Sequence, residues 1–299
     1  MRIDEVIDGI LRREVEPAHA PTEADWLATW VANDLGHADL DVMAALGGAL
    51  SDRLAWVFLS GYQATVARCF PDLPRRGGWT SFVNTEDRSG VLPGTTLSGE
   101  GDARRLNGWK GWLAASSSVE RLLVSAKQEH TPFVVLDRGT PGVRIEERGT
   151  PSYLPELTQG RVQFEDVVVP DDALTGDEHT FPLFRTTEGA YIRVALAAFM
   201  LGHARRLDAP AQLLAEAVAV LHASIGVVAQ PMPSLPSLVA SHGADLVTQH
   251  LVASFEELLR ERGPELLARW TRDRRLVTGP GDRIAARAAA DLDALGALA

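Results

Sequence analysis

The residues best suited to chemistry lie in one short stretch, LNGWKGWLAASS, at positions 106–117. Lys110, one of only two lysines in the chain, stands there between two tryptophans, and small residues follow. A turn at Asn107 and Gly108 followed by a strand would place Lys110 and Trp112 on one face of that strand. An aromatic residue followed by small residues lets another flat group approach the backbone. The alternative is that Trp112 simply packs under a neighbouring helix.

Other reactive side chains occur without the partners that a site needs. Cys69 is the only cysteine, so the chain can form neither an internal disulfide nor a cluster of thiolates, and a reducing cytoplasm fits this usage. His242 and His250 lie eight residues apart and could share a helix face. Two histidines without a third ligand are more typical of a surface than of a metal centre. We expect no metal site.

Composition limits the class of protein. The chain has 299 residues, of which 45% are hydrophobic, enough for a sizeable core. Its formal net charge of −11 argues against a protein that binds a nucleic-acid backbone. The N-terminus lacks the uninterrupted apolar run of a signal peptide, and no later segment offers the roughly 20 apolar residues of a membrane span. We expect a cytoplasmic protein with no nucleic-acid or membrane partner.

The period of the apolar residues divides the chain into three regions. In residues 1–72 they recur at helical spacing, first over residues 3–11. Thr22 and Asp25 resemble a capping box at the start of a second helix. The segment 54–70 is apolar on more than one face, which predicts a helix buried inside a bundle. Residues 1–72 are therefore predicted to form an N-terminal helical domain.

The period of the apolar residues also distinguishes the second region from the third. Residues 73–180 carry short runs of β-branched and aromatic residues, with a period of two and no helical segments between them. Their spacing predicts a compact antiparallel β domain, either a sandwich or a barrel. Residues 181–299 return to helical patterns and predict a C-terminal helical domain, interrupted by a proline-rich loop at 231–238.

The order helix, strand, helix and several motifs together resemble the acyl-CoA dehydrogenase family. LNGWKGWLAASS is similar to the family's Asn-Gly-x-Lys-x-Trp-Ile-Thr stretch, and NTE at 84–86 and VQFEDVVVP at 162–170 match two further motifs. RVALAAFMLG at 193–202 and RWTRDRRL at 269–276 resemble helical signatures of the C-terminal domain. The likeness covers most of the chain. It implies an α+β fold with an N-terminal helical domain, a middle antiparallel β domain and a C-terminal helical bundle.

The resemblance also implies a cofactor. In that family FAD lies between the middle domain and the C-terminal bundle, and the matching tryptophan packs on the isoalloxazine. Trp112 and Thr85 are therefore expected to contact a flavin, together with free backbone N–H groups from Ala114 to Ser116. Ala114 stands where the family has threonine.

Several family features are missing. The family's Gly-Ser-Asp after Thr-Glu-Pro is absent, although Ser89 or Thr95 could substitute for it. No arginine occurs between Arg206 and Arg260, which excludes the usual Arg-x-x-Phe-Gly, and the chain contains no Gln-Gly-Gly. Both elements grip the far half of FAD from a neighbouring subunit. A complete homomeric FAD site is therefore not expected.

The catalytic base is also missing from its two usual places. A carboxylate must take the α-proton of the thioester while the β-hydride moves to the flavin. This chain has Ile192 before the matching Arg193, and Thr278 at the second position. Glu188, one helical turn before Ile192, is the nearest acid, and Asp282 is another; for both, a solvated surface residue is the commoner explanation. Arg193 is expected to keep the family arginine's place, where it supports the active-site loop or packs by its stem, and it is also a candidate for binding the substrate.

The resemblance implies FAD-dependent α,β-desaturation of an acyl thioester carried by CoA or a carrier protein. Two alternatives remain open. The chain could be a catalytically incomplete partner subunit of a heteromeric acyl-CoA dehydrogenase, or a relative that only binds an acyl thioester. Because the apolar segments 196–202 and 213–228 exceed what a short bundle can cover, we expect a homo- or hetero-oligomer.

Overall fold

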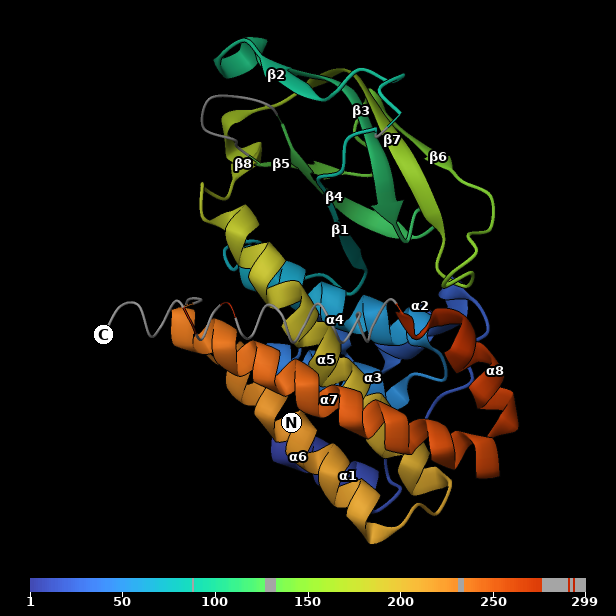
Figure 1. The fold of residues 1–299 in the computed structure, drawn as a ribbon. Helices are drawn as coiled ribbons and strands as arrows, with labels where there is room; N and C mark the ends of the chain where they lie inside the picture. Colours follow the sequence, from blue (N-terminus) through green and yellow to red (C-terminus); the bar gives the residue numbers. More distant parts are fainter. Residues whose placement is uncertain (88, 127–132, 231–233, 276–289, 291–292, 294–299) are drawn as a thin grey trace.

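The computed structural model describes residues 1–87, 89–126, 133–230 and 234–275, and the single positions 290 and 293. Within them the chain forms helices, then strands, then helices again, and Figure 1 shows the strands gathered in one domain above a body of helices. The N-terminal helices are α1 (Ile3–Leu11), α2 (Glu23–Ala32), α3 (Leu40–Leu50) and α4 (Leu54–Cys69). The C-terminal helices are α5 (Thr180–Arg206), α6 (Ala211–Val228), α7 (Leu235–Arg262) and α8 (Pro264–Asp273).

The N-terminal helices follow the sequence signals closely, with one exception. The capping box at the start of α2 is confirmed: the Thr22 hydroxyl accepts the Asp25 N–H at 3.2 Å, and the Asp25 carboxylate accepts the Thr22 N–H at 3.1 Å. Helix α4 is buried on most of its surface, as its composition predicts. The exception is α3, which the sequence did not predict because every residue from Val42 to Leu50 is buried and no polar face marks the helical period.

Helix α5 lies at the centre of the helical body, against α3, α4, α6 and α7 (Figure 1). One hydrophobic core joins the N-terminal and the C-terminal helices. All residues of the segment 196–202 are buried in it. The expectation that this segment needs a second subunit to cover it is therefore wrong, because α5 is already enclosed by its own chain.

Two glycines allow the close approach of α5 to its neighbours. A Cβ atom at Gly48 of α3 would lie 2.0 Å from the carbonyl oxygen of Ala195. A Cβ atom at Gly61 of α4 would lie 2.5 Å from the Cα of Ile192. Neither neighbour can move aside, since both are backbone atoms of the central helix. Glycine is thus required at both contacts.

The β domain is a sandwich of two four-stranded sheets within the described residues. The first sheet has the order β1 (Trp79–Val83), β4 (Val119–Ser125), β5 (Phe133–Asp137) and β8 (Leu174–Thr175). The second has the order β2 (Thr96–Ser98), β3 (Arg105–Ala114), β7 (Gln159–Val168) and β6 (Val143–Glu147). The prediction of a purely antiparallel domain is wrong at one pair, because β1 runs parallel to β4. Between β1 and β4 the chain forms β2 and β3 of the second sheet. It then forms β4, which runs in the same direction as β1.

The first sheet has two buried faces. Leu122 and Val124 of β4 point into the core between the two sheets. Leu123 between them belongs to the helical core, together with Phe82 of β1 and Phe133 of β5. This alternation is what a strand with period two imposes. The outer face of the first sheet therefore rests on the helices.

Polar contacts also attach the β domain to the helical body, at a second place. Glu23 at the start of α2 is 4% exposed, and its carboxylate accepts hydrogen bonds from Ser117 at 2.8 Å, from Ser118, and from the N–H of Thr158 at 2.8 Å. All three belong to loops at the helical end of the sandwich. One buried carboxylate thus holds two loops of the β domain to the helical body.

The C-terminal region differs from the prediction at one loop. Ser234 caps α7 by accepting the Ser237 N–H at 3.3 Å, and the helix begins at Leu235 inside the predicted loop. Pro236 is compatible with the helix because it occupies the first turn, where its missing N–H has no partner to lose. The predicted last helix at 283–295, together with Thr278 and Asp282, lies outside the described residues apart from positions 290 and 293.

We predict that Gly48→Ala lowers the free energy of unfolding by about 2–5 kcal/mol, since the methyl group meets the backbone of Ala195. Gly226→Ala is the matched control, because Gly226 is an exposed helical glycine and a methyl group added to it would meet no atom within 4 Å. It should be neutral or stabilise by about 0.5–1 kcal/mol. Urea unfolding measures both. Equal effects would contradict close packing at α5.

Candidate functional site

Strand β3 carries the stretch LNGWKGWLAASS as far as Ala114. The strand runs continuously through Asn107 and Gly108, so the predicted turn there is wrong. Gly108 has φ +117 at a shift in register, and a Cβ atom on it would lie 2.3 Å from the carbonyl oxygen of Gly94. The Asn107 side chain accepts the N–H of Asp166 at 2.8 Å. The pair therefore forms a bulge inside the strand.

A second bulge, between Lys110 and Leu113, decides where Trp112 points. Lys110 is 1% exposed and reaches toward the first sheet, and Leu113 lies in the core between the sheets. Trp112, adjacent to Leu113, therefore takes the opposite, outer face. The expectation that Lys110 and Trp112 share a face is wrong because the bulge adds one residue between them. Trp112 is half-buried and donates from Nε1 to Gln159 at 3.2 Å.

Lys110 organises the segment that follows β1. Its Nζ donates to the Glu86 carboxylate at 2.7 Å, to the Ser125 hydroxyl at 3.0 Å and to the carbonyl oxygen of Asn84 at 3.4 Å. A buried ammonium needs such partners to offset the loss of water. Two of the three lie on either side of Thr85. Lys110 is therefore a positioning residue for that threonine.

The structure brings two of the predicted flavin contacts together. The carbonyl oxygen of Thr85 accepts the N–H of Gly111 at 2.7 Å, which places Thr85 beside Trp112. Gly111 is required there, because a Cβ atom would lie 2.8 Å from the carbonyl oxygen of Glu86. The Thr85 side chain and the Trp112 ring are both half-buried, so each keeps an open surface.

Of the backbone donors expected from Ala114 to Ser116, that of Ser116 is engaged within the fold. Ala114 and Ser116 are 1% and 0% exposed. The chain turns at Ala115, with φ +53, and the N–H of Ser116 then donates to the carbonyl oxygen of Thr158 at 3.3 Å. The N–H of Ser117 donates to the Thr158 hydroxyl at 2.9 Å. These two donors serve the fold and are not available to a ligand.

The two proposed substitutes for the missing Gly-Ser-Asp are also engaged. Thr95 is fully buried, and its hydroxyl donates to the carbonyl oxygen of Trp109 at 2.9 Å. The exposed Ser89 donates its hydroxyl to Asp87. Both hydroxyls stabilise the loop before β2, so the structure gives no support to a role for them in binding.

On the helical side, Arg193 is held by polar contacts with two neighbouring helices. It is 3% exposed and forms an ion pair with Asp245 of α7. Its Nε donates to Ser224 of α6 at 3.3 Å, and Nη2 donates to Ser241 of α7 at 3.2 Å. Arg193 therefore ties three helices together. Ile192 beside it is 7% exposed and packs on Gly61, so this position holds neither a carboxylate nor open space.

Glu188 is a half-buried carboxylate with a raised pKa. It lies in the third turn of α5, is half-buried, and has neither an ion-pair nor a hydrogen-bond partner among the residues that the structure describes. Burial raises the pKa of Glu188 to about 7. Burial, and to a smaller extent the Glu188 charge, raise the pKa of Cys69 to about 12 and also that of Tyr62. A solvated residue at the start of a helix would behave differently, so that alternative is not supported.

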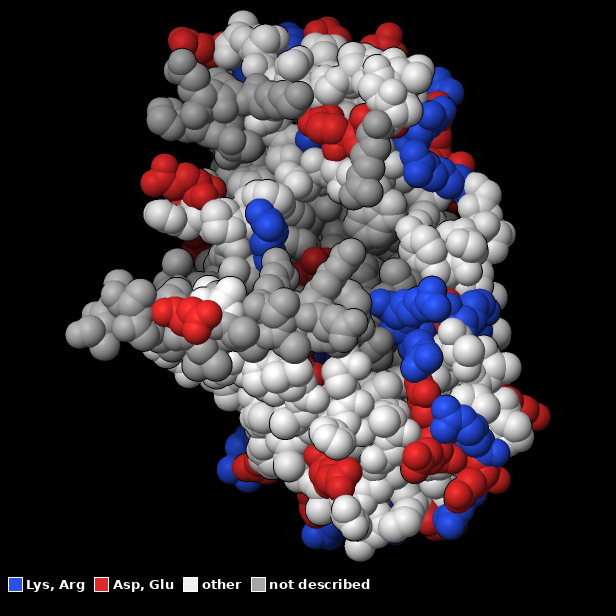
Figure 2. All heavy atoms as spheres, viewed as in Figure 1, with Lys and Arg blue, Asp and Glu red and all other residues white. Residues whose placement is uncertain are grey.

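Tyr62, which the sequence analysis did not single out, joins α4 to the β domain, and the Glu188 charge contributes to raising its pKa. Its hydroxyl accepts the N–H of Phe82 at 2.6 Å, near the end of β1 and three residues before Thr85. Phe82 in turn stacks on Phe184 of α5, with ring centroids 4.3 Å apart. The first half of α5 thus meets the end of β1. Figure 2 shows the surface hollowed between the β domain and the helices on this side of the molecule.

We predict that Lys110→Met lowers the free energy of unfolding by about 2–4 kcal/mol, because it leaves Glu86 and Ser125 without their cation. Arg161→Met is the matched control in the same domain. Arg161 pairs with Glu146 but its side chain is 39% exposed, so its loss should cost less than about 1 kcal/mol. Chemical unfolding of both variants measures the difference. Similar small losses would show that Lys110 does not hold the segment 84–86.

Comparison with proteins of known structure identifies the fold of this chain. No family model matches the chain, and no curated protein does. Among solved structures, butyryl-CoA dehydrogenase from Megasphaera elsdenii is 14% identical with a TM-score of 0.68, and 96% of each chain is covered. The prolyl acyl carrier protein oxidase AnaB is 16% identical with a TM-score of 0.66 over 97% of each chain, and an FAD complex of PigA is 14% identical with a TM-score of 0.68 over 97% of each. The chain therefore has the acyl-CoA dehydrogenase fold.

Proposed function

We propose that this chain is a flavoprotein that desaturates an acyl thioester between its α and β carbons, with Glu188 as the base. The observation that carries the proposal is the Glu188 carboxylate, half-buried and unpaired among the described residues, with a pKa of about 7. A general base works best when its pKa lies near the working pH. Perturbed carboxylates of this kind concentrate at functional sites, and this one lies where α5 meets the end of β1.

The side chains present fit one half of FAD. Trp112 offers a flat, partly open ring near the end of β3, and Thr85 lies beside it. Ala115, three residues further on, already packs in the helical core, so the pair sits close to the junction of the two parts. Trp112 and Thr85 would hold the isoalloxazine ring. A flavin, when bound, supplies the acceptor for the β-hydride.

Glu188 would perform the proton transfer. Its carboxylate would take the proton from the α carbon of the thioester while the hydride leaves the β carbon, so that a C=C bond forms and two C–H bonds break. No described cation neutralises this carboxylate, so its basicity is not reduced by an ion pair. Burial maintains this raised pKa, and Phe184, one helical turn before Glu188, stacks on Phe82 at the junction of α5 and β1.

The similar structures support a proposal for the substrate class. One of them is a dehydrogenase of a CoA thioester, butyryl-CoA, and another is an oxidase of a prolyl group on an acyl carrier protein. We therefore propose a thioester of CoA or of a carrier protein.

The alternative function, a subunit that completes its site with a second chain, is favoured by the surface of α6. This helix is long and apolar enough to cross a membrane, with a mean hydropathy of 1.7, yet only 33% of it is buried. Its outer face carries small residues, and Leu246 and Val247 of neighbouring α7 are 39% and 48% exposed. A second chain would cover this surface. Light scattering that gives 32.3 kDa, with or without a full-length homologue, would count against the alternative.

We predict that Glu188→Gln abolishes desaturation at every pH. Because the base must be deprotonated, the wild-type rate should rise as pH increases through about 7, the pKa of Glu188. Stopped-flow absorbance of the flavin measures this rate.

The same variant has a readout that needs no cofactor. The folded pKa of Glu188 lies above its ordinary value, so the charged carboxylate destabilises the fold as pH rises from about 4.5 through about 7. Glu188→Gln should therefore stabilise the protein by about 1–3 kcal/mol at pH 8, after allowance for solvent screening, and by little at pH 4. Glu178→Gln, at an exposed acid before α5, is the control and should show neither effect. A pH-independent stability difference would contradict a buried carboxylate.

We predict that Trp112→Ala weakens flavin binding about tenfold or more, since about 1–3 kcal/mol of ring contact is lost. Trp109→Ala is the control, because the Trp109 ring already packs under Arg161, with 5.0 Å between the guanidinium carbon and the ring centroid. Fluorescence titration with FAD measures both. Unchanged affinity in the Trp112 variant would mean that this ring is only part of the fold.

A further inference from the structure

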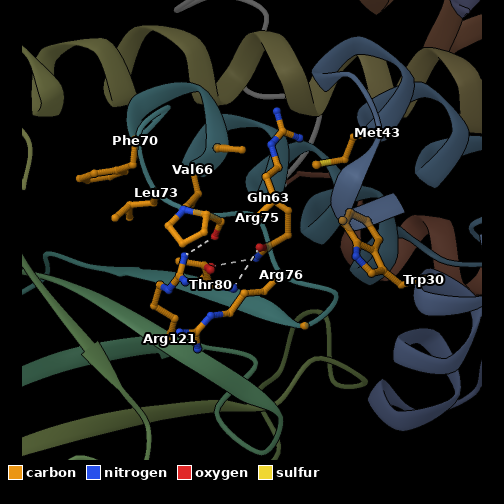
Figure 3. Close-up of a pocket in the computed structure, with 14 residues that line it drawn as sticks. Trp30, Met43, Gln63, Val66, Phe70, Leu73, Arg75, Arg76, Thr80 and Arg121 are labelled. Carbon is orange, nitrogen blue, oxygen red and sulfur yellow. Dashed lines mark hydrogen bonds between the residues drawn. The ribbon is translucent and has the colours of Figure 1, made fainter. Parts of the chain in front are cut away.

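A small cavity lies where the loop between α4 and β1 crosses the β domain, away from the Glu188 side of α4. Its volume is about 50 Å³. A water molecule occupies about 30 Å³ of liquid, so the cavity has room for one small ion or one to two waters. Figure 3 shows its polar lining, which includes Gln63, Thr80 and three arginines, Arg75, Arg76 and Arg121.

Arg121 is the unusual member of this lining. It is 4% exposed, and its only hydrogen bond among the described residues is from Nη1 to the carbonyl oxygen of Pro74 at 2.9 Å. Its Nε is buried without an acceptor, and no described carboxylate lies within salt-bridge distance of the guanidinium. A buried guanidinium normally has carboxylate or phosphate partners. Arg121 thus has donors that the protein leaves without acceptors.

The charged groups near Arg121 do not supply the missing hydrogen-bond acceptors. Arg76 and Arg121 lie on the same side of the cavity in Figure 3, and burial and the Arg76 charge both lower the pKa of Arg121. Asp137 and Glu120 act in the opposite direction. The Asp137 carboxylate, however, already accepts from Arg76 at 2.8 Å.

Two further polar side chains of the lining are also engaged. The Gln63 amide exchanges two hydrogen bonds with the backbone of Thr80, at 2.9 and 3.1 Å. Arg75 extends away from Arg121 and donates to the carbonyl oxygen of Ala38 at 2.8 Å (Figure 3). The two guanidinium groups of Arg76 and Arg121 therefore face a small space with unused donors.

We propose that this cavity binds a phosphate group through Arg121 and Arg76. Guanidinium groups bind phosphate by paired, charge-assisted hydrogen bonds, and a tetrahedral oxyanion matches the available volume. Arg75 and Arg76 are exposed, so the site opens to solvent at the loop. Inorganic phosphate would fill it, and a phosphate monoester would leave its organic part outside. The site is independent of the proposed desaturase activity.

Thermal unfolding tests the site on the full chain, with increasing phosphate or glycerol 2-phosphate and with chloride at matched ionic strength. Phosphate should raise the melting temperature in a saturable manner, and chloride should not. The monoester should act like phosphate if the organic group stays outside. A larger rise in melting temperature with glycerol 2-phosphate than with phosphate would identify a phosphate ester as the ligand. No rise with glycerol 2-phosphate would identify inorganic phosphate as the ligand. Phosphorus-31 NMR measures the stoichiometry, which should be one.

Variants assign the effect to the cavity. Arg76→Gln, at the exposed loop, should weaken phosphate binding about tenfold without loss of folding, and Arg121→Gln should weaken it by at least as much. Asp137→Asn removes the negative charge that competes with phosphate for Arg76 and should strengthen binding by about two- to fivefold. Arg144→Gln is the control, because its side chain is 71% exposed on β6.

Two results would overturn the proposal. Equal shifts with phosphate and chloride would show an ionic-strength effect without a site. A saturable phosphate effect that Arg76→Gln and Asp137→Asn leave unchanged would place the ion elsewhere. Because Arg121→Gln could unfold the loop, the opposite effects expected of Arg76→Gln and Asp137→Asn decide the question even if that variant is insoluble.

Discussion

The bulge between Lys110 and Leu113 in β3 is the feature on which the proposed site depends. It turns Lys110 inward, where its ammonium group holds the segment 84–86, and it turns Trp112 outward to a face that keeps part of the ring open. A regular strand would place both side chains on one face. The tryptophan would then compete with the lysine for the space between the sheets, and Thr85 would lose both its anchor and its aromatic neighbour.

The site also requires that the β domain keep a fixed position on the helices. Apolar contact supplies one part of this, through Phe82 stacked on Phe184. Buried charge supplies another. Glu23 binds two loops of the sandwich, and Glu156 of a further loop contacts Arg53 of the N-terminal helices at 3.3 Å and Arg272 of α8 at 2.9 Å. Paired groups in a partly dry junction resist rotation because each lost partner leaves a charge unsatisfied.

The sequence predicted the order of the elements, the capping box at Thr22 and the resemblance that the solved structures support at the level of fold. It missed what depends on tertiary contact. Helix α3 has no polar face that would mark it in the sequence. The parallel pairing of β1 with β4 depends on the strands of the second sheet that lie between them in the chain. A bulge adds one residue to β3 and so moves the side chains that follow it to the opposite face of the strand. Burial gives Glu188 its raised pKa, and the sequence shows only a glutamate on a helix. Arg121 was hidden because arginine supplies nearly all of the positive charge in this chain.

The central claim is that the chain recognises the ring half of a flavin through Trp112 and Thr85 and lacks the usual grip on the adenosine half. Comparison of FMN and FAD binding to the purified chain tests it most directly, since FMN carries the same ring without the adenosine. We predict dissociation constants within about tenfold of each other, a difference of about 1.4 kcal/mol or less, and a loss of both in Trp112→Ala. FAD that binds about a hundredfold or more tightly than FMN, a difference of about 2.7 kcal/mol, would contradict this claim.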